Sequence, residues 1–414
     1  MSLTNPASPT VFLADSQAIK DITRPRSGVV QEVEVPKVFL GMFGPNVSTF
    51  EGDTWKHHRR ITQRAFTEKN VQLVWSESVL VTEQLFRQWD KEHGQVVHIS
   101  KLSHVTETLA LMVISSAALG QRMSWRGEPN KLLPLGFKVS FQQAISTVSS
   151  SILLRHGGKL DQNVMGTKDV TLAPTENLFS VLMSASEEDM AAAGKGLADD
   201  EITGNAFLIL FAGHETTAHA LAFTMGLLAA YPEVQSEVYA QEYTDMSQLN
   251  MVTGAFMEPL RMYPVVPQLA KVAEEDVVVN VALNGPDSSK DDRANIAIPA
   301  GSIVIMSTLG IHYNPRYWPQ PEEFQPSRFC EDYDKDAFLP FSTGRRVCLG
   351  KRFAETEATA VIATILAKYE ISIDATKFPT IPGEAIHARR ERLLRPYHFL
   401  TMVPENMPLV FTHR

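Results

Sequence analysis

The chain has 414 residues, of which 44% are hydrophobic and 21% are charged, and its formal net charge is −9 at pH 7. A nucleic-acid partner would require a basic surface, so none is expected, whereas the length and apolar content suffice for a large buried core. With only two cysteines, Cys330 and Cys348, a disulfide framework is excluded and each thiol must be explained singly.

The N-terminal end of the chain contains neither a basic region followed by an apolar run nor a stretch long enough to cross a membrane. Neither a signal peptide nor a membrane anchor is therefore expected there. Apolar residues recur at helical spacing in the segments that follow, which predicts helices over residues 54–63, 71–92 and 102–119.

A longer apolar helix is predicted from the acidic residues 199–201 to Tyr231, where a proline stops it. His214, Glu215 and His219 interrupt this run, so it lacks the continuous apolar length of a membrane span. The expected structure is a buried core helix.

Strand signals are few and short. Residues 277–281 and 296–298 flank a loop of turn-forming residues and predict an irregular hairpin, and residues 301–306 predict a further strand. Residues 315–340 are rich in Pro, Trp and Phe without periodicity, which indicates a packed coil, and a last helix is predicted over residues 350–369. The fold is therefore expected to be mainly α with small β-sheets.

The strongest chemical signal surrounds Cys348, where residues 341–350 read Phe-Ser-Thr-Gly-Arg-Arg-Val-Cys-Leu-Gly. Cys348 precedes a predicted helix, whose free N–H groups and positive dipole end favour a thiolate, and Arg346 adds a cation. Zinc would require further Cys or His ligands, and none lies near in the sequence. A single thiolate ligand of a haem iron fits this pattern, whereas Cys330 has no motif around it and is expected to be a plain thiol.

A second signal lies within the long helix, where residues 212–217 read Ala-Gly-His-Glu-Thr-Thr. An acid and two alcohols are costly in a buried helix unless they are used. Gly213 and the threonine hydroxyls can loosen the local backbone hydrogen bonds and open a groove. Helix packing is the alternative explanation for His214 and Thr217.

Both segments resemble those of the cytochromes P450. The haem loop of that family reads Phe-x-x-Gly-x-Arg-x-Cys-x-Gly, and every fixed position is present here between Phe341 and Gly350. The family's oxygen-binding helix carries Ala-Gly-x-(Asp/Glu)-Thr, which matches residues 212–216. The resemblance, which extends from about Val11 to the C-terminus, implies the cytochrome P450 fold in a single domain over residues 1–414.

The resemblance also implies a cofactor, heme b (iron protoporphyrin IX), and roles for the residues of the two segments. Cys348 is then the axial thiolate ligand of the iron, and Phe341 and Gly213 contribute to the cofactor site. Glu215 and Thr216 are implied to deliver protons to dioxygen, allowing scission of its O–O bond.

Four further residues are implied to bind the haem propionates, which need cations and indole or amide donors. Trp55 and Arg59 match the Trp-x-x-x-Arg of the family's third helix, and Arg346 contributes from the haem loop. Lys271 falls where relatives place a cationic propionate partner. An amphipathic surface helix is the alternative explanation for Trp55 and Arg59.

A third pattern, Glu258-Pro-Leu-Arg261, places an acid and a base three residues apart on one helix face. In the family this pair locks with an arginine of a Phe-x-Pro-x-Arg-Phe segment, here Arg328. The resemblance implies a buried ion network that stabilises the core beneath the haem and takes no part in catalysis. Pro259 lies either in the first turn of this helix or in its interior, where it would cost about 3 kcal/mol.

The implied activity is a haem-dependent monooxygenase that inserts one oxygen atom from dioxygen into a small apolar substrate, such as a secondary-metabolite intermediate. Electrons would come from an NADPH-dependent flavoprotein reductase, steered to the basic cluster of Arg345, Lys351 and Arg352; an ordinary solvated charge cluster is the alternative. Two rival interpretations are a haem-thiolate isomerase, dehydratase or peroxide-using enzyme, which usually lacks the acid–alcohol pair, and a truncated, non-catalytic family member.

The likeness is to fungal microsomal members, but three segments are shorter here: the N-terminus, the stretch from Leu154 to Asn177 and the stretch from Tyr231 to Met251. None of these gaps removes a chemical motif. The sequence alone is compatible with a diverged enzyme and with an incomplete gene model. Relatives are anchored on the cytosolic face of the endoplasmic reticulum, and because no anchor is seen in this chain, membrane association and localisation are undecided.

Overall fold

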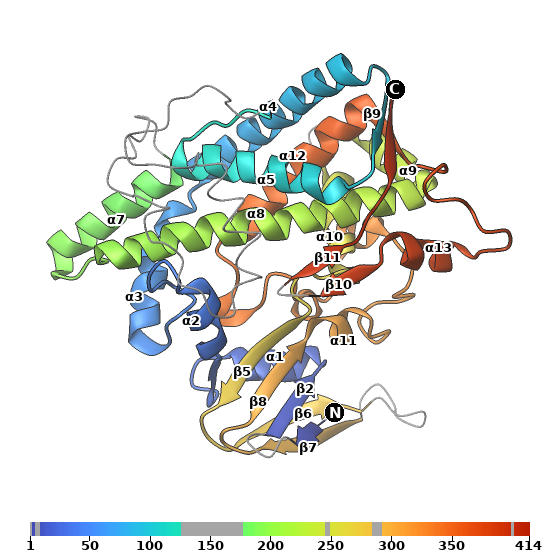
Figure 1. Cartoon of the computed structure of the whole chain (residues 1–414). Coiled ribbons are helices and arrows are strands. Elements are labelled where there is room, and N and C mark those ends of the chain that lie inside the picture. The colour runs from blue at the N-terminus through green and yellow to red at the C-terminus, as the bar shows by residue number, and fades with distance from the viewer. Residues whose placement is uncertain (1, 5–8, 126–176, 245–248, 284–291, 399–400) are drawn as a thin grey trace. The chain divides into compact units, whose positions relative to one another are not determined.

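The computed structural model describes residues 2–4, 9–125, 177–244, 249–283, 292–398 and 401–414 (Figure 1). These residues form two compact units. The first unit comprises Met1–Glu32, His93–Thr106 and His219–Arg414, and the second comprises Val33–Glu92 and Glu107–Ala218. The expectation of one domain over the whole chain stays a prediction.

The first unit contains the β-sheets. Its largest sheet has the order β1 (Ser2–Thr4), β2 (Pro9–Leu13), β8 (Ile303–Ser307), β5 (Gln268–Ala273) and β3 (Val29–Gln31). β2 pairs with β8 in parallel, and β8 pairs with β5 in antiparallel fashion, as Figure 1 shows. Val304 and Met306 of β8 are buried while their neighbours are partly exposed, which is the alternation expected of a strand with one face on a core.

Three smaller sheets complete the β-structure described in this unit. They pair β6 (Val277–Ala282) with β7 (Arg293–Ile298), β10 (Pro396–His398) with β11 (Met402–Pro404), and both β4 (Val96–Ile99) and β9 (Tyr369–Ile373) with β12 (Leu409–His413). The β6–β7 hairpin is fastened to the unit by Asp15, whose carboxylate accepts from the Ala282 N–H and from Arg293.

The first unit contains several helices, among which α10 packs against α9, α11 and α12. They are α1 (Ser16–Thr23), α9 (Pro232–Thr244), α10 (Asn250–Met262), α11 (Thr308–His312), α12 (Lys351–Lys368) and α13 (Ile386–Leu393), together with the C-terminal part of α8 (Asp199–Ala230). On α12, Val361, Ile362, Ile365 and Leu366 are buried at helical spacing, so hydrophobic burial fixes this helix in the core.

The second unit is helical. It contains α2 (Glu34–Leu40), α3 (Gly52–Thr62), α4 (Glu68–Glu92), most of α5 (Leu102–Leu119), α7 (Leu178–Ala193) and the N-terminal part of α8. Local sequence explains both ends of α7. Asn177 and Ser180 form a reciprocal capping box at its start, and Gly194 adopts a left-handed conformation (φ 65°) at its end.

The mainly α expectation is confirmed, and the bounds of individual elements are corrected in places. The predicted helix 102–119 coincides with α5, whereas α3 begins at Gly52, two residues before its predicted start. The coil predicted between residues 315 and 340 contains two short 3-10 helices, Pro326–Cys330 and Lys335–Ala337. Pro259 lies in the interior of α10, which decides between the two positions expected for it.

Two described helices, α5 and α8, are long and apolar enough to cross a membrane by length and composition. About two-thirds of each qualifying stretch (67%) is buried inside the structure, as in the core helices of soluble proteins, which pass the same test. The core-helix expectation for α8 therefore agrees with its burial.

Candidate active site

The predicted site residues fall into two groups, one in each compact unit. The first unit holds Lys271, Phe341, Arg346 and Cys348, and the second holds Trp55, Arg59, Gly213, Glu215 and Thr216.

The loop that carries Cys348 is closed by its own backbone. The Cys348 N–H donates to the Phe341 carbonyl at 2.9 Å, and α12 begins three residues later, with Gly350 as its N-cap. Gly344 adopts φ +65°, and a Cβ there would lie 2.9 Å from two atoms of Thr23, so only glycine fits. The loop thereby presents an exposed thiol just before a helix start.

The donor set around this thiol bears on which metal it could hold. Among the described residues, no three His, Cys, Asp or Glu side chains gather where they could bind a metal ion. A structural zinc site, which needs four protein ligands, is therefore not formed by the described residues, and a single thiolate ligand is what a haem iron would need from the protein.

Cations accompany the thiol in the first unit. Lys271 on β5 is 4% exposed, and its ammonium lies 3.3 Å from the amide oxygen of Gln31 on β3. Burial, and repulsion from Arg345, lower the pKa of Lys271 to about 8. Burial also lowers the pKa of the Arg346 guanidinium to about 10. A buried ammonium beside the neutral amide of Gln31 and the cation of Arg345 favours an anionic ligand, which fits a propionate.

The sequence patterns did not predict that Gln31 contacts Lys271. The two residues face each other because β3 pairs with β5 in antiparallel register, with Gln31 opposite Lys271. They are separated by 240 positions in the chain, so no local pattern could have pointed to this contact.

In the second unit, α8 presents its polar residues on its more open face. Gly213, Glu215 and Thr216 are partly exposed, whereas His214 and Thr217 are buried. The helix is continuous through this stretch, so the expected local loosening is not observed, and the Thr216 hydroxyl donates to the Ala212 carbonyl at 2.7 Å. Glu215 and Thr216 are therefore consecutive, partly exposed residues of α8.

Gly213 has a packing role as well. A Cβ at this position would lie 3.1 Å and 3.2 Å from the side-chain carbons of Ile114 on α5. The absence of a side chain therefore lets α5 and α8 approach closely beside the Glu215–Thr216 pair.

Helix α3 carries Trp55 and Arg59 one turn apart, so both side chains share one face. Trp55 is 5% exposed and Arg59 is partly exposed. The indole of Trp55 thus lies on the buried face of α3, and the propionate role of Trp55 and Arg59 stays a prediction.

The predicted ion network of the first unit is confirmed. Arg261 donates from Nε and one Nη to the two oxygens of Glu258, each at 2.8 Å, and Arg328 Nε donates to Glu258 at 3.1 Å. Glu258 and Arg261 are fully buried, and Arg261 also donates to the His312 carbonyl. A buried carboxylate held by two guanidinium groups is a structural anchor for this part of the chain.

A model of the cytochrome P450 family matches residues 2–394, which include all of the candidate site residues. The chain belongs to the cytochrome P450 family. A cytochrome P450 monooxygenase from Postia placenta, number 124, is 35% identical, and the match covers 99% of this chain and 84% of the relative. A cytochrome P450 monooxygenase from Arthrobotrys oligospora is 27% identical, with 88% and 74% of the two chains covered.

Among solved structures, a zebrafish cytochrome P450 with progesterone covers 100% of this chain and 96% of its own, with a TM-score of 0.74 and 20% identity. This similarity confirms the cytochrome P450 fold. Because the fungal relatives are monooxygenases, this cytochrome P450 is an oxidoreductase of the monooxygenase class, and the family implies haem and iron.

Proposed function

We propose that this cytochrome P450 binds heme b through the thiolate of Cys348 and inserts one atom of dioxygen into a small apolar substrate. The observation that carries the proposal is the Cys348 loop, which presents an exposed thiol just before a helix start, with no cluster of three metal-binding side chains among the described residues. When bound, the haem supplies dioxygen activation and oxygen-atom transfer. The remaining oxygen atom leaves as water after uptake of two electrons and two protons.

The chain's own residues divide the remaining tasks. In the first unit, Lys271 and Arg346 would bind propionate, and the helix start beyond Cys348 would favour its thiolate form. Phe341 of the haem loop, also in the first unit, would contact the porphyrin. In the second unit, Trp55 and Arg59 would bind propionate, and Gly213 of α8 would leave room for the porphyrin. Thr216 would hold a proton at its hydroxyl, and Glu215 would replenish it.

The electron donor is proposed to be an NADPH-dependent flavoprotein reductase, which would approach the basic cluster of Arg345, Lys351 and Arg352. The class of substrate, a small apolar molecule such as an intermediate of secondary metabolism, is proposed from the fungal relatives. The accessible Glu215–Thr216 pair favours oxygen insertion over the isomerase, dehydratase and peroxide-using alternatives, whose chemistry needs no delivery of protons to dioxygen.

The carbon monoxide difference spectrum of the reduced, purified chain tests the proposal. A Soret band at the position typical of thiolate-bound haem is expected for the wild type, and Cys348→His should move the band to that of a nitrogen ligand. Cys330→Ser is the matched control and should leave the spectrum unchanged. A wild-type protein without any haem signal would rule out the proposed function.

A further inference from the structure

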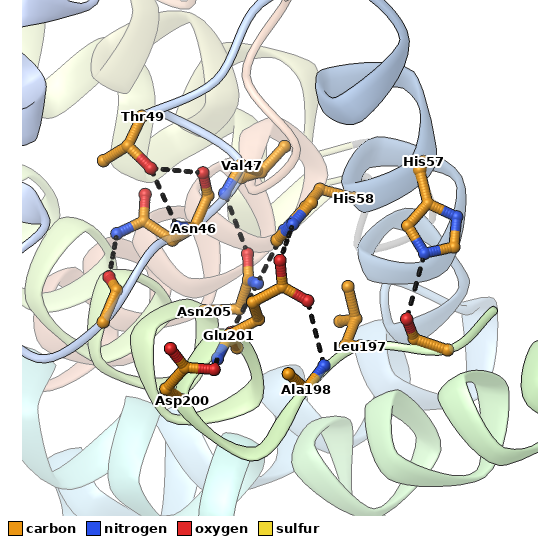
Figure 2. Close-up of polar contacts among 12 residues, drawn as sticks. Asn46, Val47, Thr49, His57, His58, Leu197, Ala198, Asp200, Glu201 and Asn205 are labelled. Atoms are coloured by element: carbon orange, nitrogen blue, oxygen red, sulfur yellow. Dashed lines mark hydrogen bonds and ion pairs between the residues drawn. The ribbon is translucent and has the colours of Figure 1, made fainter.

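A hydrogen-bonded cluster in the second unit, shown in Figure 2, joins the turn before α3 and α3 itself to the distant start of α8. At its centre is His58 of α3, whose imidazole is fully buried. Its Nε2 lies 3.1 Å from a carboxylate oxygen of Glu201, and its Nδ1 lies 3.1 Å from the amide nitrogen of Asn205. Both partners belong to the first two turns of α8.

Backbone groups at the two ends fix the direction of every hydrogen bond in this cluster. The Val47 N–H donates to the Asn205 amide oxygen at 3.0 Å, so the Asn205 amide nitrogen must face His58 and the Glu201 carbonyl. The Ala198 N–H donates to the second carboxylate oxygen of Glu201 at 2.9 Å. His58 must therefore accept at Nδ1 and donate from Nε2 to Glu201, which is the neutral imidazole in one tautomer.

The third segment of the cluster is a tight turn over residues 46–49. Asn46 and Thr49 are buried and bonded to each other, which leaves the Val47 N–H directed at Asn205. The turn approaches α8 closely, because a Cβ on Gly204 would lie 2.4 Å from the carbonyl oxygens of Gly44 and Pro45. In this cluster the turn is fastened to the start of α8 by Val47 and Asn205, and α3 is fastened there by the side chain of His58.

We propose that His58 is a positioning residue of the cofactor site, which as a neutral imidazole holds the propionate-binding helix α3 in register with the oxygen-binding helix α8. The inference rests on the proposed function. His58 adjoins Arg59 and lies one turn after Trp55 on α3, while α8 carries Glu215 and Thr216 farther along. Rotation or sliding of α3 on α8 would displace the propionate ligands from the residues that handle protons.

Protonation of His58 would release this fastening. An imidazolium has a second N–H at Nδ1, which would meet the amide N–H of Asn205, and Asn205 cannot turn over without losing its bond to Val47. The ionisable groups that face His58 are Glu201 of α8, His57 of α3 and Lys195 before α8, and residues 46–49 contribute none. Burial is the largest influence and lowers the pKa of His58 below its ordinary value of 6.5.

The hydrogen bonds of His58 should depend on pH. Because the folded chain favours neutral His58, the fastening is complete above pH 6.5 and is lost as the pH falls through the lowered pKa. Loss of haem should therefore accelerate below pH 6.5.

The test measures the rate of haem transfer from the holoprotein to excess apomyoglobin, together with the thermal midpoint, from pH 5 to pH 8. His58→Phe keeps a buried ring but loses both hydrogen bonds, and it should release haem about tenfold faster at pH 7.5. His58→Gln keeps a donor and an acceptor but cannot be protonated, so it should restore slow release and abolish the acceleration in acid. The matched control is His57→Phe, which removes the neighbouring bond to the Gly196 carbonyl and should change the rate less than twofold.

A double-mutant cycle separates positioning from general stability. If His58 acts through α3, His58→Phe should have little further effect on haem release in an Arg59→Gln background. Three outcomes would each overturn the inference: equal rates of haem release for His58→Phe and His57→Phe, additive effects with Arg59→Gln, or faster release in acid for His58→Gln. A thiolate–haem spectrum of the same proteins would leave the proposed function intact. A wild type without haem would overturn both.

Discussion

At the scale of single residues, Lys271 is the clearest indication of an anion-binding site. Burying its ammonium beside a neutral amide is costly, and lowering its pKa from 10.5 to about 8 corresponds to roughly 3 kcal/mol. We expect Lys271→Met to raise the free energy of unfolding of the apoprotein at pH 7 by an amount of this order and to weaken haem binding. Chemical denaturation of the apoprotein and titration with haemin measure the two opposite effects.

The same residue predicts a pH dependence of haem uptake. Below pH 8, Lys271 is already protonated in the apoprotein, whereas above pH 8 the anion must bring a proton with it. Haem affinity should therefore fall by up to about tenfold per pH unit above pH 8 in the wild type, and not in Lys271→Met. Lys377→Met, at an exposed lysine of the same unit, should follow the wild-type curve. Identical curves for Lys271→Met and wild type would contradict a propionate role.

Thr216 and Thr217 offer a matched pair for the proton-handling proposal. Thr216 is partly exposed on the open face of α8, and Thr217 is 3% exposed. Thr216→Val should keep the haem spectrum but lower the product formed per NADPH about tenfold, with hydrogen peroxide released in its place. Thr217→Val, which removes the same hydroxyl from a buried position of α8, should leave this ratio unchanged. The measurement is the stoichiometry of NADPH, product and peroxide, and equal coupling in the two variants would count against the role of Thr216.

At the scale of elements, two glycines of α8 allow a clash with backbone atoms to be compared with a clash with a side chain. Alanine is favoured over glycine in a helix by about 1 kcal/mol, so any loss must come from the surroundings. At Gly204 a Cβ would meet backbone carbonyls at 2.4 Å, whereas at Gly213 it would meet the end of the Ile114 side chain at 3.1 Å. We expect Gly204→Ala to lower the free energy of unfolding by about 1–3 kcal/mol and Gly213→Ala to change it by less than about 1 kcal/mol. Denaturant unfolding of both variants distinguishes these outcomes, and equal losses would show that helix approach at Gly204 is not rigid.

The elements also show why some structure could be predicted from the sequence and some could not. α5, α8 and α12 were predictable because apolar residues repeat along one continuous segment. β5 and β12 were missed, because they are short and their partners are remote in the chain, as with the pairing of β12 to β4. Periodicity reports which face of a segment is buried and carries no information about the distant segment that buries it.

At the scale of the whole molecule, the same division applies to the candidate site. The residues of the haem loop and of residues 212–217 could be predicted because motif chemistry is local. His58, Glu201, Asn205 and Gln31 could not, because each acquires its meaning from a partner many residues away. Local motifs therefore predict the residues expected to contact the cofactor. The long-range hydrogen bonds that involve His58 and Gln31 are seen only in the structure.

The acid limit of stability is a property of the whole chain that the structure makes predictable. His312 is fully buried, donates from Nδ1 to the Arg261 carbonyl at 3.0 Å and accepts at Nε2 from the Leu339 N–H at 2.9 Å. Both ring nitrogens are thus committed in the neutral form, and burial lowers the pKa of His312 to about 3. In the unfolded chain the same ring takes up a proton near pH 6.5.

The contribution of His312 is therefore complete above pH 6.5 and is lost progressively as the pH falls toward 3, by about 1.4 kcal/mol per pH unit where the unfolded ring is protonated. Between pH 4 and 6.5, His312 and His58 should each contribute to the decline, because burial lowers the pKa of both rings. Urea unfolding at a series of pH values should give a shallower decline for His312→Gln than for wild type, and a still shallower one for the double variant with His58→Gln. His387→Gln, at a side chain that is 40% exposed, is the control and should keep the wild-type slope. A slope as steep in His312→Gln as in the wild type would mean that His312 is protonated in the folded chain, which its two hydrogen bonds to backbone groups forbid in this structure.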